Sequence, residues 1–262
     1  MEIVKAYLTN NDCYKEARKL TKVYGIVKHS TGVNNPNLIR YVGTHSTLGV
    51  NNGLNWNKSG VYKCVHFLIG LNAKGEVKCY QTLPLEYQCW GCGSGSKGSF
   101  NQTHIQYEIL EDGLTNKDYF QKAFALAREL DVYLCKLFNL KADSIVSHAE
   151  AHKLGYASDH ADCDHWLAKF GGSMQKERAA VDLLLNPPVP PTVDPPSTKV
   201  NFIVKIIVST LNVRSGPGIN YKIVTTVKKN EVYTIVETKG SWGRLKSGAG
   251  WINIASDYVK KI

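Results

Sequence analysis

The chain has 262 residues, of which 43% are hydrophobic, and it carries a formal net charge of +10. This length allows one large domain, or a medium domain followed by a small one, and the apolar share allows a real core. The composition argues against a disordered chain, and no apolar run approaches the ~20 residues of a membrane span.

The predicted helices and strands alternate before residue 186, which is typical of an α/β or α+β domain. Apolar runs predict strands at 24–28, 64–71, 76–83, 103–110 and 144–146. Apolar residues at helical spacing and capping residues predict helices at 12–20, 116–138 and 173–185. The stretch 147–166, SHAEAHKLGYASDHADCDHW, is expected to be a polar loop after the last strand.

A proline-rich segment at 186–199, NPPVPPTVDPPSTK, divides the chain. Proline fixes its own φ and biases the preceding residue toward extended conformations, so a semi-rigid linker is expected. The domains are therefore predicted at 1–185 and 200–262. The second one shows short strands, turns about every ten residues and no helix, which favours a small β-barrel.

Most of the net charge lies in the C-terminal segment, residues 197–262, here called the tail. Residues 197–262 contain eleven basic and three acidic residues, a net charge of +8, which leaves +2 for residues 1–196. A cationic module suits a polyanion, such as nucleic acid, an anionic membrane face or a phosphate-bearing wall polymer. The tail has no recognition helix and no aromatic–basic RNA motif, so nucleic-acid binding is not favoured.

The N-terminus does not resemble a secretory signal peptide, since it carries Glu2 and no apolar stretch behind a basic cluster. Together with the odd number of seven cysteines, this predicts reduced thiols and synthesis in the cytoplasm. Cys89 and Cys92 form one C-x-x-C pair, but no second pair completes a structural zinc site. Packing or turn roles are expected for both.

The predicted loop at 147–166 concentrates zinc-binding residue types: four of the eight histidines, three aspartates, Glu150 and Cys163. A catalytic zinc requires three such ligands and one open position. Two distant residues are further candidates. His29 ends a predicted strand, where it is either a site residue or a hydrogen-bonding core residue. Glu108 interrupts an apolar strand, either on a solvated face or pointing into a site.

In combination these segments resemble the zinc-dependent N-acetylmuramoyl-L-alanine amidase type 2 family, which includes phage endolysins and bacterial autolysins. The resemblance covers residues 20–185 and rests on the order GIVKHST, VHFLIG, GEVKCYQTLPL, WGCG, IQYEIL and SHAEAH…SDHADCDHW. It implies an α/β domain with a mixed sheet and surrounding helices. It also implies one zinc ion per chain and cleavage of the amide between the lactyl group of N-acetylmuramic acid and L-alanine.

The resemblance implies three zinc ligands. His29 and His148 match the two family histidines, and Asp162 matches the third ligand. Many relatives continue with Pro-Gly, whereas this chain continues with Cys163 and Asp164, each of which also offers a ligand atom. In the family the third ligand lies two positions after a catalytic Lys or His. Asp162 lies two positions after His160, so this spacing favours Asp162.

The resemblance also implies catalytic roles. Glu108 matches the family acid that acts as general base, and His160 matches the cation that stabilises the oxyanion. Trp90 and His66 are weaker candidates for substrate binding. Trp90 matches the tryptophan of the family turn W-H-x-G, which reads WGCG here, and His66 matches a strand histidine that is usually outside the zinc shell. The remaining histidines are expected to be surface, capping or supporting groups: His45, His104, His152 and His165.

The tail motifs LNVRSGPG and W-G…G-W-I resemble the bacterial SH3-like domains attached to wall hydrolases. This resemblance implies anchoring to the cell wall, with peptidoglycan and anionic wall polymers as partners. Trp251 is expected in the core of this domain, and Trp242 is left open between core and surface. Neither membrane insertion nor a nucleic-acid partner is expected, and the sequence does not indicate the oligomeric state.

The leading hypothesis is a phage or prophage endolysin for a Gram-positive host, made in the cytoplasm and released through a holin. A host autolysin has the same chemistry and a different delivery. A non-catalytic peptidoglycan recognition protein is the alternative of another class. The presence of all three predicted ligands together with Glu108 argues against that alternative.

Overall fold

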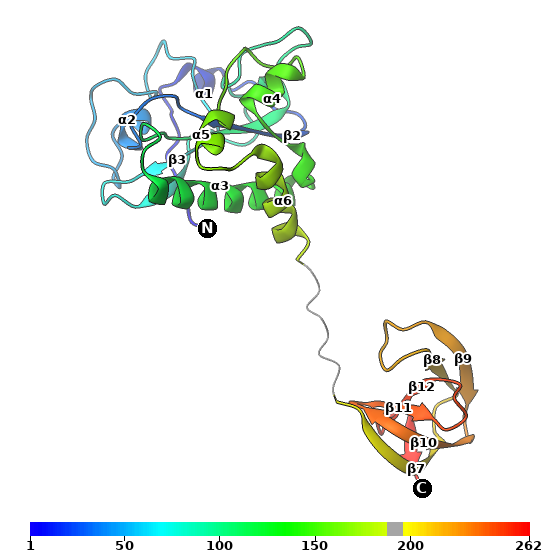
Figure 1. The fold of residues 1–262 in the computed structure, drawn as a ribbon. Helices are drawn as coiled ribbons and strands as arrows, with labels where there is room; N and C mark the ends of the chain where they lie inside the picture. The colour runs from blue at the N-terminus through cyan, green and yellow to red at the C-terminus, as the bar shows by residue number, and fades with distance from the viewer. Residues whose placement is uncertain (188–195) are drawn as a thin grey trace. The chain divides into compact units, whose positions relative to one another are not determined.

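The computed structural model describes residues 1–187 and 196–262, which form two compact units (Figure 1). The predicted linker therefore lies mostly outside the described residues. The first unit ends with a helix that stops at Leu185, and the second begins with a strand at Thr198. The last two residues of the predicted linker thus belong to that strand. Within the described residues, no helix is both long and apolar enough to span a bilayer.

A six-stranded mixed sheet forms the centre of the first unit, in the order β1-β4-β3-β5-β2-β6. The strands are β1 (Ile3–Lys5), β2 (Gly25–Ser30), β3 (Phe67–Leu71), β4 (Val77–Gln81), β5 (His104–Ile109) and β6 (Ile145–Ser147). β3 and β4 form the predicted antiparallel hairpin, and the other neighbouring pairs are parallel. β1 was not predicted, because three residues are too short to show an alternating pattern.

Six α-helices surround the sheet: α1 (Asp12–Glu16), α2 (Ile39–Val42), α3 (Lys117–Phe138), α4 (His148–Lys153), α5 (Asp164–Lys169) and α6 (Met174–Leu185). The long α3 follows its cap Asn116 and lies along the sheet beside α6 (Figure 1). α1 stops before the predicted end at Leu20, because Ala17 adopts a left-handed conformation with φ of 50°.

The stretch 147–166 contains two short helices, α4 and α5, so its prediction as a loop was wrong. α4 begins with a capping box, in which Glu150 N donates to Ser147 Oγ and Ser147 N donates to Glu150 Oε2, both at 3.1 Å. The sequence S-x-x-E at residues 147–150 is the motif of such a cap and could have predicted this helix. The cap fixes the position of His148, the first residue of the helix.

Alternation along β2 and β5 separates a core face from a polar face. Ile26, Ile105 and Ile109 pack with α3 in the main hydrophobic core. The intervening positions on the other face hold His29, Gln106 and Glu108 in place of a continuous apolar surface. Polar side chains of two adjacent strands are thereby gathered on one side of the sheet.

A buried ion pair fixes the strand that carries His29. Lys28 Nζ lies 2.9 Å from Asp131 Oδ2 on α3, and neither side chain is exposed. Burial lowers the pKa of Lys28, but the charges of Asp131 and Glu177 outweigh burial and raise it. The adjacent lysine therefore points to α3 and His29 points to the opposite face.

The second unit is a seven-stranded sheet in the order β13-β7-β10-β11-β12-β8-β9, with antiparallel neighbours. Its strands are β7 (Thr198–Ile206), β8 (Thr210–Arg214), β9 (Ile223–Lys228), β10 (Val232–Lys239), β11 (Trp242–Leu245), β12 (Trp251–Asn253) and β13 (Val259–Lys261). The mixed α/β unit and this all-β unit confirm the predicted fold class.

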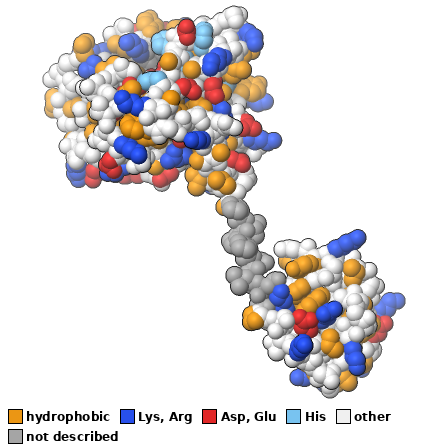
Figure 2. Space-filling view, viewed as in Figure 1, with side chains coloured by type: hydrophobic (Ala, Val, Ile, Leu, Met, Phe, Trp, Pro, Cys, Tyr) orange, Lys and Arg blue, Asp and Glu red, His pale blue; other side chains and the backbone are white. Residues whose placement is uncertain are grey.

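Trp251 is half-buried and lies outside the hydrophobic core of the second unit, so its assignment to the core was wrong. The next residue on β12, Ile252, is fully buried, and alternation places Trp251 on the opposite face. Trp242 is also half-buried. On the face seen in Figure 2, basic side chains are scattered over this unit and do not form one patch.

Candidate functional site

His29, His148 and Asp162 form a compact group of metal-binding side chains. The Nδ1 atoms of the two histidines lie 3.1 Å apart, and Asp162 oxygens lie 3.1 Å and 3.4 Å from them. Zinc–ligand bonds of about 2.0–2.2 Å in tetrahedral geometry place ligand atoms about 3.3–3.5 Å apart. Among the described residues, this is the one group of three or more such side chains that could hold a metal ion.

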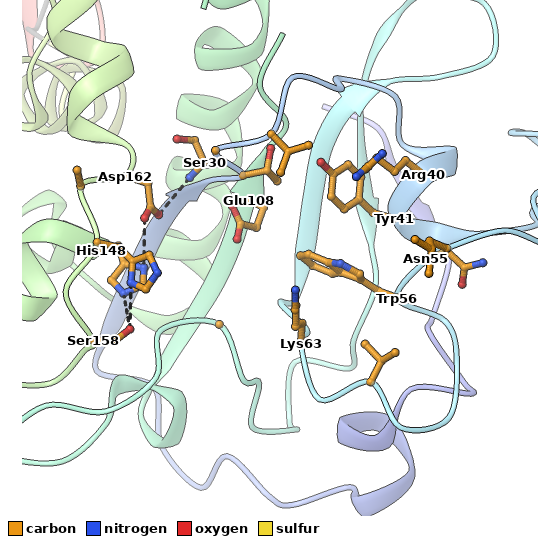
Figure 3. Close-up of a pocket in the computed structure, with 18 of the residues that line it drawn as sticks. Ser30, Arg40, Tyr41, Asn55, Trp56, Lys63, Glu108, His148, Ser158 and Asp162 are labelled. Carbon is orange, nitrogen blue, oxygen red and sulfur yellow. Dashed lines mark hydrogen bonds and ion pairs between the residues drawn. The ribbon is translucent and has the colours of Figure 1, made fainter. Parts of the chain in front are cut away.

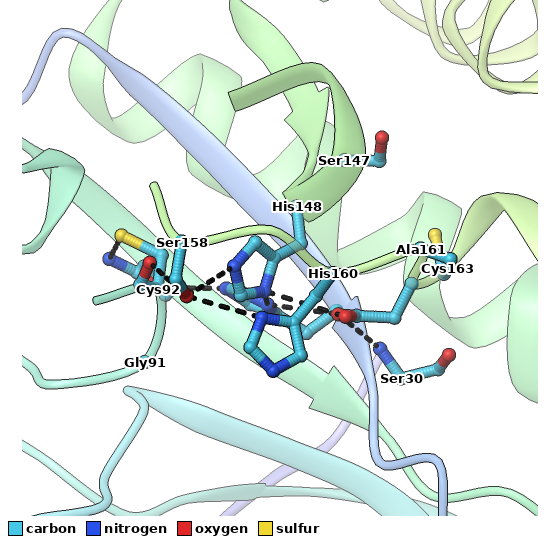
Figure 4. Close-up of polar contacts among 12 residues, drawn as sticks. Ser30, Gly91, Cys92, Ser147, His148, Ser158, His160, Ala161 and Cys163 are labelled. Carbon is cyan, nitrogen blue, oxygen red and sulfur yellow. Dashed lines mark hydrogen bonds and ion pairs between the residues drawn. The ribbon is translucent and has the colours of Figure 1, made fainter. Parts of the chain in front are cut away.

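Two residues that the sequence analysis missed orient these histidines. His29 Nε2 donates to Gln106 Oε1 at 2.9 Å, which leaves the Nδ1 lone pair free for a metal. Ser158 Oγ lies 3.4 Å from His148 Nε2 and supports His148 as Gln106 supports His29 (Figure 4). Gln106 is fully buried, and its Nε2 donates to Asn101 Oδ1 at 3.0 Å. The position of Gln106 two residues before Glu108, on one strand face, was the available signal.

Asp162 is the third donor of the group, and its two alternatives lie elsewhere. Cys163 is fully buried in the main core, where its Sγ contacts Met174 Sδ at 4.0 Å, and it points away from the histidines in Figure 4. Asp164 begins α5 and does not belong to the group. Burial raises the pKa of Asp162, but hydrogen bonds from His148 and His29 outweigh it and hold this pKa well below its ordinary value.

Glu108 stands beside the donor group with an unsatisfied carboxylate oxygen. Its Oε2 atom is enclosed and makes no hydrogen bond within the described part of the chain. Burial, followed by the negative charges of Asp162 and Glu111, raises the pKa of Glu108 well above its ordinary value. An enclosed carboxylate with a raised pKa is a candidate proton acceptor and donor.

His160 is exposed next to the donor group. Its ring packs against that of His148 with centroids 4.6 Å apart, and its Nδ1 lies 3.1 Å from Ser158 Oγ (Figure 4). Ser158 thus contacts both rings, and His160 Nε2 has no assigned hydrogen bond among the described residues. The arrangement leaves one ring nitrogen able to act on a ligand.

These residues open onto a cleft of about 750 Å³ (Figure 3). His148, Asp162, Glu108 and His160 line one end, and Figure 3 shows the other end formed by α2 and the loop after it. Further lining residues are Ser30, Thr31, Arg40, Tyr41, Asn55, Trp56, Lys63, Ser158 and His165. The cleft is therefore longer than the donor group and can hold an extended ligand.

His66 does not contact the cleft, so its assignment to substrate binding was wrong. Its side chain is fully buried, its Nε2 donates to Tyr87 O at 2.9 Å, and its Nδ1 accepts from Gln106 N at 3.0 Å. Burial lowers its pKa to about 4. His66 supports the strand that carries Gln106 and has no ring nitrogen left for a ligand.

Trp90 is 40% exposed and precedes Gly91, which lines the cleft. Its ring lies 5.8 Å from that of Tyr62, and the Arg18 guanidinium lies 5.4 Å from its centroid. These contacts hold the indole near the rim, where a substrate-binding role is geometrically allowed.

All seven cysteines are free and buried, and none joins a metal-binding group within the described residues. Burial raises the pKa of both Cys89 and Cys92. Cys92 Sγ accepts from Gln106 Nε2 at 3.4 Å. Cys89 packs in a small core cluster with Cys13, Cys64 and Leu83, whereas Cys92 helps to hold Gln106.

His165 lines the cleft, although the sequence analysis expected only a surface, capping or supporting role for it. Its Nε2 lies 3.1 Å from Glu111 Oε1. Glu111 is buried and also accepts from Ser30 Oγ at 2.5 Å. This carboxylate links the end of β2 to α5 through its contacts with Ser30 and His165.

Comparison with protein families gives two matches. Residues 19–165 match the family described as N-acetylmuramoyl-L-alanine amidase, and residues 209–260 match the bacterial SH3 domain. The chain is also 48% identical over 40 residues to Bacillus subtilis (strain 168) YrvJ, whose name describes it as an N-acetylmuramoyl-L-alanine amidase. That match spans 15% of this chain and only 8% of YrvJ.

Two solved structures can be compared with this chain. The Staphylococcus aureus hydrolase AmiA, in complex with its ligand, has a TM-score of 0.50 and 18% identity over 71% of this chain and 83% of that one. The catalytic domain of XlyA has a TM-score of 0.48 and 19% identity over 69% and 99% of the two chains. At this identity, the likeness to AmiA shows a shared fold.

Proposed function

Since this chain belongs to the N-acetylmuramoyl-L-alanine amidase family, we propose that it hydrolyses the amide between the lactyl group of N-acetylmuramic acid and L-alanine in peptidoglycan. The observation that carries the proposal is the group of His29, His148 and Asp162, with Glu108 beside it in one cleft. A recognition protein without activity requires neither an enclosed carboxylate nor a complete donor set, so their presence favours catalysis.

His29, His148 and Asp162 would hold one zinc ion through two imidazole nitrogens and a carboxylate. Zinc suits this donor set and supplies Lewis acidity, which polarises the scissile carbonyl and activates water. Gln106 keeps His29 in the tautomer with a free Nδ1, and Ser158 supports His148 in the same way.

Glu108 is the proposed general base and acid. Its Oε2 takes a proton from the attacking water and returns it to the amine that leaves with L-alanine. The pKa of Glu108 is raised toward neutral pH, and a carboxyl with such a pKa can both accept and release a proton. The absence of a competing hydrogen bond to Oε2 from the described residues supports this role.

His160 is the proposed stabiliser of the oxyanion. Ser158 engages its Nδ1 and leaves Nε2 as a donor toward the cleft. A cationic donor placed where negative charge develops lowers the barrier. The exposed position of His160 leaves its ring accessible to a ligand in the cleft.

For the second unit we propose anchoring to the cell wall, supported by the match to the bacterial SH3 domain and the net charge of +8 over residues 197–262. Peptidoglycan and anionic wall polymers are the proposed partners. An endolysin released through a holin and a secreted host autolysin would both reach the wall and cleave the same bond. The endolysin remains the prediction that the sequence favours.

A chelation experiment tests the function. The full chain should release peptide from purified muramoyl-peptide, lose this activity when a chelator removes the metal, and regain it when zinc is added. Release that persists in the metal-free protein would rule out the proposed zinc chemistry. Cleavage between sugars would rule out the amidase reaction.

A further inference from the structure

The end of the cleft remote from the metal donors carries two basic side chains, Arg40 and Lys63. Arg40 lies on α2, and Lys63 lies on the loop that leads to β3. Figure 3 shows Lys63 directed into the space between Glu108 and Trp56, with Arg40 beyond Tyr41. Neither side chain forms an ion pair within residues 1–187 and 196–262, since no carboxylate there lies within 4.0 Å of its charge.

The other charges that line the cleft have partners or assigned roles. The acidic lining residues are Glu108 and Asp162, both at the metal end. The Nε2 atom of His165 lies 3.1 Å from Oε1 of the buried Glu111, so this ring nitrogen already has a partner inside the protein. Arg40 and Lys63 are thus the cations of the cleft that are available to a negatively charged ligand.

A third group supports a ligand at this end. Tyr41 is 4% exposed and lines the cleft, and its hydroxyl lies close to the side chains of Thr31 and Arg40 without a hydrogen bond of full geometry among the described residues. Its ring is fixed edge-on against Trp56, with centroids 5.3 Å apart at 85°, and Trp56 N donates to Tyr41 O at 2.8 Å. The hydroxyl is therefore held next to the Arg40 guanidinium, where it can donate a hydrogen bond to a ligand in the cleft.

We propose that Arg40, Lys63 and Tyr41 form a subsite that binds a free carboxylate of the stem peptide, and that the enzyme therefore prefers unamidated stem peptides. This inference rests on the proposed function, because the metal end and the subsite share one cleft and must contact one substrate molecule. The peptide chain that continues beyond L-alanine carries carboxylates. A guanidinium fork matches a carboxylate in shape and charge, and the ammonium and hydroxyl groups supply further donors.

The test uses two soluble muramoyl-peptides that differ only in one stem-peptide group, a carboxylate or the corresponding carboxamide. The wild-type full chain should show kcat/KM about tenfold higher for the carboxylate substrate, as expected for a charge-assisted contact, mainly through a lower KM. Arg40→Gln and Lys63→Gln should raise KM for the carboxylate substrate and leave the carboxamide substrate nearly unchanged. Tyr41→Phe should reduce the preference by a smaller factor.

Lys169→Gln, on the exposed side of α5, is the matched control and should retain the preference. Zinc content and the unfolding midpoint should be the same in all variants. Equal cleavage of both substrates by the wild type, or equal losses on both substrates in Arg40→Gln and Lys63→Gln, would overturn the subsite and leave the amidase function intact. Failure of the wild type to cleave either substrate at the lactyl amide would instead overturn the proposed function.

Discussion

His29 and Glu108 are paired in register on the adjacent parallel strands β2 and β5. Paired residues of parallel strands project to the same face of a sheet, so the metal-binding imidazole and the proposed base lie side by side. The distance between them is set by hydrogen bonds between strands and not by a flexible loop. A catalytic pair on rigid neighbouring strands keeps its geometry without substrate.

Glu108→Gln should retain zinc and lose most of its activity. Glu108 lies outside the donor group, so the metal content should stay near one ion per chain. General acid–base catalysis contributes roughly 10² to 10⁴ in rate, so kcat should fall by that factor. The exposed Glu86→Gln is the control and should be fully active. Activity of Glu108→Gln within a few-fold of the wild type would refute the role of this carboxyl.

Asp162→Ala should lose the metal, whereas Cys163→Ser should keep it. The carboxylate lies 3.1 Å from His29 Nδ1, while the thiol is enclosed in the core against Met174. Elemental analysis of both purified variants measures the difference. Cys163→Ser should lower the free energy of unfolding by about 1–3 kcal/mol, because it buries a hydroxyl in an apolar site. Metal loss in Cys163→Ser alone would mean that the third ligand is misassigned.

Gln106→Leu should weaken metal binding without removing a ligand. The amide oxygen accepts from His29 Nε2 at 2.9 Å and holds the tautomer that frees Nδ1. Loss of such a supporting contact typically costs roughly tenfold to a hundredfold in metal affinity, measurable by competition with a chromogenic chelator. Gln102→Leu, at an exposed position nearby, is the matched control. Unchanged affinity in Gln106→Leu would show that His29 does not depend on this contact.

Much of this site could be predicted from the sequence, because zinc donors are chemically distinctive. His29, His148, Asp162, Glu108 and His160 come together in one place although they are spread over more than a hundred residues. Of the two alternatives that the alternation of β5 allowed for Glu108, the structure shows the second: its side chain lines the cleft that holds the metal-binding group.

The supporting residues could not be predicted in the same way. Gln106 is separated from His29 by 77 positions, and its place beside Glu108 on one strand face does not by itself show that the amide contacts a metal-binding histidine. Tyr41 and Arg40 lie on a helix of four residues, which is too short for a periodic signal. The pairing of Glu111 with His165 likewise depends on the meeting in space of α5 and the segment that follows β5.

The stability of the first unit should fall in mild acid through His66. Burial lowers its folded pKa to about 4, below its ordinary value of 6.5. Its contribution is complete above pH 6.5 and is lost as the pH falls toward 4, because only the unfolded chain binds the proton in that window. The loss amounts to about 3 kcal/mol.

Denaturant unfolding of the metal-free protein between about pH 7 and pH 4 measures this slope. His66→Asn should be less stable at neutral pH and should show a shallower decline in acid. His104, whose pKa burial also lowers to about 4, contributes to the slope that remains. Parallel declines in the wild type and His66→Asn would show that His66 titrates normally in the folded state.

Mass spectrometry of purified cell wall digested by the full chain tests the central claim most directly. Hydrolysis of the lactyl amide predicts glycan strands with free lactyl carboxylates, together with peptides that bear new L-alanine amino termini. Neither product should form with metal-free protein. New reducing sugar ends, or cleavage within the stem peptide, would contradict the assignment of His29, His148, Asp162 and Glu108 to an amidase.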